Sequence, residues 1–173
     1  MRTARVVLFV LILCASRLAM AEDESILKNG DFEKGKMGWK MEPGIRVVDE
    51  PGAAPGQPAN QVLEAEAHKS RTRKMQAQLN VSTKAKALIF SMRVKASPSF
   101  RSATPSADQL TLRLERPDRS ATFTSRRIAT NDVWQTIDWN YTQLEGARRL
   151  DFSIEFHPGD GSVYVDDAVM KEE

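Results

Sequence analysis

The stretch that decides the fold is Ala87–Ala96, with the sequence ALIFSMRVKA. Apolar residues occupy every second position: Leu88, Phe90, Met92, Val94 and Ala96. Polar residues fill positions between them: Ser91, Arg93 and Lys95. Because successive side chains of a β-strand point to opposite faces of its sheet, this alternation predicts a strand with one face in a core and the other in solvent.

Two other stretches repeat the pattern. Residues 108–116, DQLTLRLER, place a leucine at every second position, and residues 148–156, RRLDFSIEF, alternate large apolar with polar residues. Weaker strand candidates show the same features over shorter runs: residues 45–49, 62–67, 75–81, 122–128, 134–142 and 163–170. The sequence thus predicts nine or ten strands.

Turn-forming residues separate these strands, and no helical periodicity lies between them. The longest such segments are residues 49–60, DEPGAAPGQPAN, and residues 96–108, ASPSFRSATPSAD. Many strands with one apolar face each favour an all-β fold in which two antiparallel sheets pack face to face as a β-sandwich. We interpret residues 49–60 as a loop inside a single domain, because the short piece before it could not fold alone.

The first 21 residues predict a signal peptide. A basic start, MRTAR, precedes the apolar run from Val6 to Ala15, and Ala19-Met20-Ala21 provides a cleavage site between small residues. The apolar run is far shorter than the roughly 20 residues that cross a membrane as a helix. We therefore expect a secreted protein, extracellular or periplasmic, whose domain comprises residues 22–173.

The composition of residues 22–173 excludes several classes of site. The only cysteine, Cys14, lies within the predicted signal peptide, so neither disulfides nor a thiol nucleophile nor a cysteine-ligated zinc is available. These residues contain 22 lysines and arginines and 23 aspartates and glutamates, a net charge of −1. This balance gives no indication of a nucleic-acid partner, and we expect no membrane partner either.

Four segments carry a resemblance to a known family. They are NGDFEKGKMGW at 29–39, MQAQLNVSTKAKALIFSMRVKAS at 75–97, VWQTIDWNYT at 133–142 and GSVYVDDAVM at 161–170. In this order the chain resembles carbohydrate-binding modules of the family 4/9/16/22 type, over essentially all of residues 26–171. The resemblance implies a jelly-roll β-sandwich of the galactose-binding-like kind and a function in binding a polysaccharide or oligosaccharide.

The resemblance also implies a structural calcium ion that ties the first and last strands together. Carried over by residue, its side-chain ligands are Glu33 and Asp166, with Asp31 and Asp167 as lesser candidates and backbone carbonyls supplying most other contacts. Calcium accepts six to eight oxygen ligands in flexible geometry, which suits such a site. The alternative is that Glu33 and Asp166 are two solvated carboxylates at strand ends.

Catalysis is not expected. The chain has two histidines, His68 and His157, and contains no serine nucleophile elbow, HExxH or glycine-rich phosphate loop. A glycosidase needs two facing carboxylates, and the sequence leaves open a pair formed by Asp138 with Glu115 or Glu155. We predict a non-catalytic protein.

Aromatic rings that stack on sugars should be exposed. Trp39, Trp134 and Trp139 are assigned to structural positions or to the inward face. This leaves Phe100 and Phe123 as candidate platform residues. Four outward polar residues are candidates for hydrogen bonds to sugar hydroxyls on a concave face: Arg93, Arg113, Asp138 and Asn140.

Two functions remain open from the sequence. The first is a secreted glycan-binding module, which we expect to be a monomer and which could work beside a separate secreted enzyme. The second is a structural or protein-interaction β-sandwich without sugar binding, which a missing aromatic platform would favour.

Overall fold

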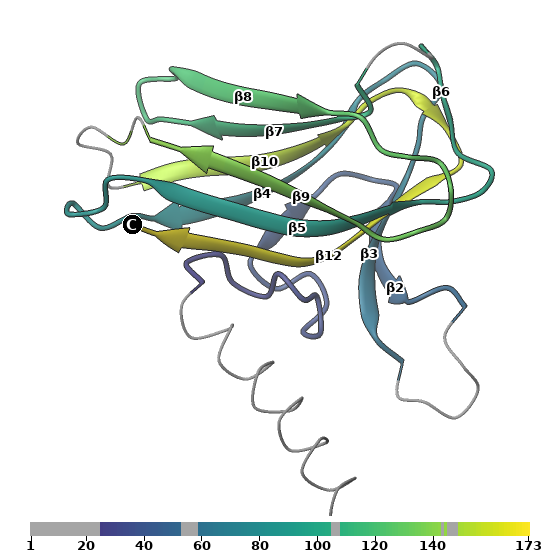
Figure 1. The fold of residues 1–173 in the computed structure, drawn as a ribbon, viewed down its shortest axis with the longest axis horizontal. Coiled ribbons are helices and arrows are strands. Elements are labelled where there is room, and N and C mark those ends of the chain that lie inside the picture. Colours follow the sequence, from purple (N-terminus) through teal and green to yellow (C-terminus); the bar gives the residue numbers. More distant parts are fainter. Residues whose placement is uncertain (1–24, 53–58, 105–107, 143, 145–148) are drawn as a thin grey trace, which may run out of the picture.

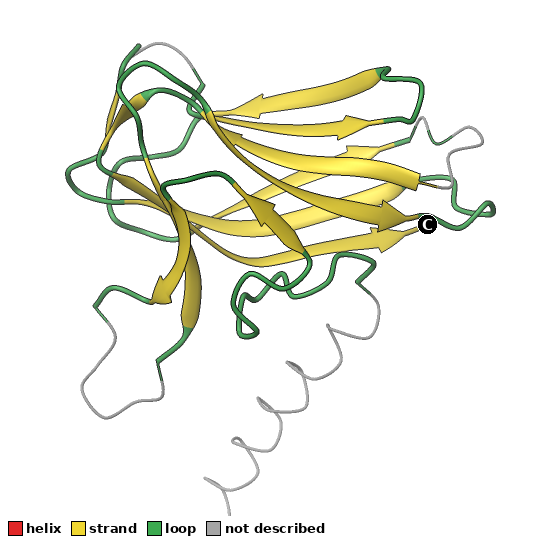
Figure 2. Ribbon diagram, turned by 180° about the vertical axis from the view of Figure 1, so that it is seen from behind, coloured by secondary structure: helices red, strands yellow, loops and turns green. Residues whose placement is uncertain are grey.

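The computed structural model describes residues 25–52, 59–104, 108–142, 144 and 149–173. The predicted signal peptide with Cys14 lies outside the described residues, as does the middle of the proline-rich loop. Figure 2 shows strands joined by loops throughout the described part. That part contains no helix long and apolar enough to cross a membrane.

Sheet A has five antiparallel strands in the order β1-β4-β10-β7-β8. Its strands are β1 (Trp39–Met41), β4 (Arg73–Asn80), β10 (Arg149–Phe156), β7 (Leu110–Glu115) and β8 (Ala121–Arg126). The central strand, β10, therefore comes from the C-terminal part of the chain, and it pairs with β4 and β7 (Figure 1).

Sheet B has five antiparallel strands in the order β2-β3-β12-β5-β9. Its strands are β2 (Ile45–Asp49), β3 (Gln61–Glu66), β12 (Ser162–Glu172), β5 (Leu88–Ala96) and β9 (Gln135–Tyr141). Its central strand is β12, the last in the chain. A two-stranded ribbon of β6 (Arg101–Ser102) and β11 (Gly159–Asp160) closes one end of the sandwich (Figure 1).

The antiparallel β-sandwich predicted from the sequence is confirmed. Each predicted strand corresponds to an observed one, with ends that differ by at most two residues. The sequence missed β1, β6 and β11, which have only two or three residues each and are too short for alternation to show. It also missed an irregularity in β12, where the pairing with β5 changes register between Asp166 and Val169.

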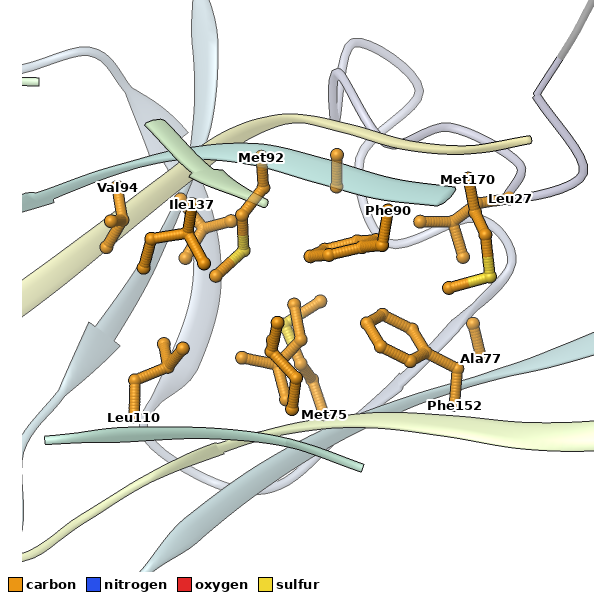
Figure 3. Close-up of a cluster of buried hydrophobic side chains, with 14 of the residues drawn as sticks. Leu27, Met75, Ala77, Phe90, Met92, Val94, Leu110, Ile137, Phe152 and Met170 are labelled. Carbon is orange, nitrogen blue, oxygen red and sulfur yellow. The ribbon is translucent and has the colours of Figure 1, made fainter. Parts of the chain in front are cut away.

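The core fills the space between the two sheets (Figure 3). Phe90 of β5 and Phe152 of β10 point toward each other from opposite sheets, with ring centroids 4.8 Å apart. The inward residues of β5, β7 and β10 are all buried, as their parity predicts. Burial of this apolar surface is the main contribution to the stability of the fold, since disulfides are absent from residues 22–173.

The segment at residues 29–39 caps one edge of this core. Asn29 organises it: its side-chain amide donates to the carbonyl oxygens of Gly35 and Met37, at 2.8 and 3.1 Å, and its Oδ1 accepts from the Lys34 amide. Phe32 and Trp39 are buried, and their ring centroids lie 5.8 Å apart. These two rings therefore fill the edge of the sandwich.

The same segment joins the beginning of the described chain to its last strand. The Ala168 amide donates to the Gly30 carbonyl at 2.9 Å, and the Ile26 amide donates to the Met170 carbonyl at 2.8 Å. The contact is so close that a Cβ on Gly30 would lie 1.7 Å from the carbonyl oxygen of Ala168. Glycine is therefore required at position 30 by a neighbouring backbone.

Candidate functional site

Each sheet presents one face to solvent. Face A is the outward surface of sheet A, and its side chains include Lys40, Lys74, Gln76, Gln78, Thr111, Arg113, Glu115, Phe123, Ser125, Asp151, Ser153 and Glu155. Face B is the outward surface of sheet B, and its side chains include Arg46, Glu64, Ser91, Arg93, Lys95, Thr136, Asp138, Asn140, Tyr164 and Asp166. The core, about 10 Å thick, separates the two faces.

Polar side chains from neighbouring strands gather on face A. Arg113 of β7 lies opposite Ser153 of β10 in the strand pairing and donates to Glu115 at 3.1 Å. On the other side of β10, the Gln78 amide donates to Asp151 Oδ1 at 3.3 Å. Face A therefore offers both donors and acceptors close to its centre.

A shallow depression of about 360 Å³ lies at the β1 side of this face. Its walls combine backbone with amide, ammonium and carboxylate groups: Gly38, Lys40, Gln76, Ala77, Gln78 and Asp151. The Lys40 ammonium makes no hydrogen bond or ion pair with any other described residue. A polar ligand in this depression would thus meet a cation, amides and a carboxylate.

Two hydroxyl groups and an imidazole contact one another on face A, on the side nearest β8. Thr111 Oγ1 lies 2.8 Å from Ser125 Oγ and 2.9 Å from His157 Nε2. His157, which directly follows β10, therefore contacts a residue of β7. The sequence did not indicate this connection, because the three residues come from separate segments.

The two predicted platform rings have opposite environments. Phe123 on β8 lies opposite Arg113 in the strand pairing, and 64% of it is exposed. Phe100 is only 1% exposed, and it belongs to the core. The prediction of Phe100 as a platform residue is wrong, because its loop folds back and buries the ring under the end of the sandwich.

The predicted hydrogen-bonding residues do not form one site. Arg113 lies on face A with Phe123, whereas Arg93, Asp138 and Asn140 lie on face B. Alternation along a strand says which residues point outward, but not to which sheet the strand belongs. The expectation that all four line one concave face is therefore wrong.

The same division removes the catalytic pair that the sequence left open. Asp138 points outward from sheet B, and Glu115 and Glu155 point outward from sheet A. The whole core lies between them, so no glycosidic bond could lie between these carboxylates.

The two predicted calcium ligands meet N–H donors near the start of β3. Glu33 Oε1 accepts from the Gln61 amide at 2.9 Å. Asp166 Oδ2 accepts from Arg93 Nη2 at 2.7 Å and from the Asn60 side chain at 3.0 Å, and Oδ1 accepts from the Asp167 amide at 2.8 Å. A calcium site needs oxygen ligands directed at one point, and the donors around Asp166 do not fit that need.

Asp166 is 1% exposed. Burial raises the pKa of this carboxyl group, while the hydrogen bond from Asn60 acts in the opposite direction. Within the described residues there is no group of three or more histidine, cysteine, aspartate or glutamate side chains that could hold a metal. The calcium ion implied by the resemblance stays a prediction, without support from the contacts of Asp166.

Trp134 lies on the face B side, where it contacts charged groups. The Arg93 guanidinium carbon lies 5.0 Å and the Lys95 ammonium 5.2 Å from the ring centroid. The indole N–H donates to Glu50 Oε1 at 2.7 Å, and Asn60 donates to Glu50 Oε2 at 3.0 Å. Both Glu50 carboxylate oxygens thus accept a hydrogen bond within the protein. Sequence reasoning missed these contacts because it assigned Trp134 to a structural position and gave it no surface partners.

The Glu50 contacts predict a dependence of stability on pH. Burial is the largest single influence and raises the pKa of Glu50, but the hydrogen bonds from Trp134 and Asn60, with other effects, outweigh it and lower that pKa. A lowered pKa in the folded state stabilises the fold above pH 4.5, the ordinary value for glutamate, and this contribution is lost as the pH falls through the folded value.

We therefore expect Glu50→Gln to lose less unfolding free energy between neutral pH and pH below 4.5 than the unmodified chain does. Urea unfolding at both pH values measures the difference. Asp138→Asn, at an exposed carboxylate of face B, controls for the loss of one negative charge. Equal acid sensitivity of all three proteins would contradict the prediction.

The likeness of this chain to known proteins lies in its fold. No protein-family model and no curated protein matches it. Solved structures do match over most of its length. A family 61 carbohydrate-binding module in complex with β-1,4-galactotriose has a TM-score of 0.58 and 13% identity, covering 86% of this chain and 99% of its own.

Other carbohydrate-binding modules agree with this. A family 4 module matches with a TM-score of 0.56 and 17% identity, over 85% of this chain and 99% of its own. A family 22 xylan-binding domain from Paenibacillus barcinonensis matches with a TM-score of 0.56 and 16% identity, over 83% and 91%. The fold is that of carbohydrate-binding modules. The expected jelly-roll β-sandwich is thereby confirmed.

One similar structure belongs to an enzyme. The enzymatically active domain of a tailspike protein from bacteriophage CBA120 matches with a TM-score of 0.64 and 8% identity, over 86% of this chain but 21% of its own. Identities this low establish the shared fold alone. Function must be argued from the faces of this chain.

Proposed function

We propose that this chain is a secreted, non-catalytic module that binds an oligosaccharide or polysaccharide on face A. The observation that carries the proposal is the arrangement of this face. Hydrogen-bonding side chains from several strands surround a polar depression, and an exposed ring lies at the β8 edge. Modules solved as a galactotriose complex and as a xylan-binding domain share the fold, which supports a glycan as the partner.

The chemistry of face A suits sugar hydroxyls, which both donate and accept hydrogen bonds. Gln76 and Gln78 can do both, Arg113 donates, and Asp151 accepts. Phe123 offers a ring face for the apolar side of a sugar. Since each contact replaces one with water, the net gain per hydrogen bond is small, and we expect dissociation constants of about 1 mM to 1 μM.

Face B is the less suitable surface because its central arginine, Arg93, is held by a buried carboxylate, whereas the pair of Arg113 and Glu115 on face A stays more than one third exposed. Arg93 contacts Asp166 and Asp167, and Arg46 contacts Glu64. A ligand there would have to displace intramolecular contacts. The site is therefore proposed on face A. A non-catalytic role is proposed because Asp138 lies on the opposite face from Glu115 and Glu155.

The test is a polysaccharide-affinity and glycan-array screen of residues 22–173, including β-glucans, xylans, mannans, galactans and sulfated polysaccharides. N-terminal sequencing of secreted protein checks that the mature chain begins at Glu22.

We expect Phe123→Ala and Arg113→Ala each to weaken retention about tenfold, equivalent to about 1.4 kcal/mol, with little change in Tm. Asn140→Ala, on face B, should leave retention unchanged.

Two outcomes would count against the proposal. If folded protein retains no glycan in this screen, the structural or protein-interaction function becomes the better explanation. If Asn140→Ala weakens retention as much as Phe123→Ala does, the binding surface is not face A.

A further inference from the structure

On face B, β5 and β12 meet the residues at the start of β3. The carboxylate of Asp166 lies buried there, directly before the change of register in β12. The next residue, Asp167, has a left-handed backbone conformation with φ of 48° and brings a second carboxylate to the same place. Two adjacent carboxylates repel each other, so a positive charge beside them stabilises their ionised forms.

We propose that the guanidinium group of Arg93, and not a metal ion, supplies this charge and fastens the last strand to the sheet. Its Nη2 lies 2.7 Å from Asp166 Oδ2, and its Nε lies 2.7 Å from Asp167 Oδ2. The Nη2 contact is a hydrogen bond, whereas the Nε contact is an ion pair by distance, with its N–H not aligned for a bond.

Arginine suits this position better than a mobile cation would. The guanidinium is planar, stays charged at every accessible pH and can serve two carboxylates at once. The Trp134 ring, 5.0 Å from the guanidinium carbon, packs beside it and restricts its motion. The charge is thus held in place by the chain itself.

The oxygens that a calcium ion would use are already engaged. A carboxylate offers about four lone-pair sites, and donors from Arg93, Asn60 and the Asp167 amide use three on Asp166. Asn60 also donates to Glu50, and its neighbour Gln61 donates from its backbone to Glu33. Groups at the start of β3 thus donate hydrogen bonds to both carboxylates that the resemblance assigns to calcium.

The first test removes the guanidinium. Arg93→Met should lower Tm by about 5–10 °C, because it leaves the buried Asp166 without its cation. Arg46→Met is the matched control: it also breaks an arginine–carboxylate pair on face B, but Arg46 is 65% exposed, and we expect a loss of less than about 2 °C. If Arg93→Met fails to fold, Arg93→Lys, which keeps the charge but not the planar fork, should give a measurable intermediate loss.

The second test measures coupling and metal dependence. In an Asp166→Asn background, Arg93→Met should cost much less than it does alone. The Tm of the unmodified protein should not change with excess chelator or with added calcium. Equal costs of Arg93→Met in both backgrounds would overturn the proposal. So would purified protein that contains calcium by metal analysis and melts at a lower temperature once the calcium is removed.

Discussion

Replacing Gly30 with alanine is expected to destabilise the protein by more than about 3 kcal/mol, the range of severe overpacking. The new Cβ would lie 1.7 Å from the carbonyl oxygen and 2.7 Å from the carbonyl carbon of Ala168. Neither partner can move freely, since the Ala168 amide donates to the Gly30 carbonyl. Thermal unfolding followed by circular dichroism should show a loss in Tm of about 10 °C or more.

Gly35→Ala provides the control for this substitution in the same segment. Gly35 has φ of +64°, and a Cβ there would meet nothing within 4 Å. Its cost should be that of a left-handed alanine alone, about 1–2 kcal/mol. If both substitutions lower Tm by the same amount, the close approach of residues 29–39 to β12 is not a main contribution to stability.

The second large effect is expected for Phe152→Ala, which should cost about 3–5 kcal/mol. Phe152 is fully buried in the middle of β10, and its ring centroid lies 4.8 Å from that of Phe90 in the opposite sheet (Figure 3). The centroid of the Trp39 ring lies 6.3 Å away. Removing its ring would leave a cavity at the contact between the two sheets. Denaturant unfolding measures the change in free energy.

Phe123→Ala is the matched control, since it removes the same ring from the same sheet but from its exposed side. We expect a change within about 0.5 kcal/mol. A cost at position 123 close to that at position 152 would show that the Phe123 ring packs against the protein, which would contradict its proposed availability to a sugar.

The strands could be predicted from the sequence because their signal is local. In β5, β7 and β10 the inward residues follow from parity alone, and the structure buries all of them. Strand order could not be predicted in this way. The pairing of β12 with both β3 and β5 depends on contacts between residues far apart in the chain, which leave no periodic pattern.

The candidate site was predicted in part for the same reason. Arg113 and Phe123 belong together because β7 and β8 are consecutive strands that pair with each other. Arg93 carries the same outward signal as Arg113, yet β5 lies in the other sheet. Phe100 was misplaced because the burial of a loop residue depends on how the whole loop folds, and Ser-rich surroundings do not reveal it.

The order of the strands has a consequence for when this protein can fold. As the chain is synthesised, β10 and β12 emerge last, and each is the central strand of its sheet. Before then, sheet A consists of the separate pairs β1-β4 and β7-β8, and sheet B of β2-β3 and β5-β9. Isolated two-stranded ribbons are marginal in water, so the incomplete chain has no stable structure to adopt. For the export that we propose, this delay would keep the chain extended and able to cross a membrane until β10 and β12 have been made.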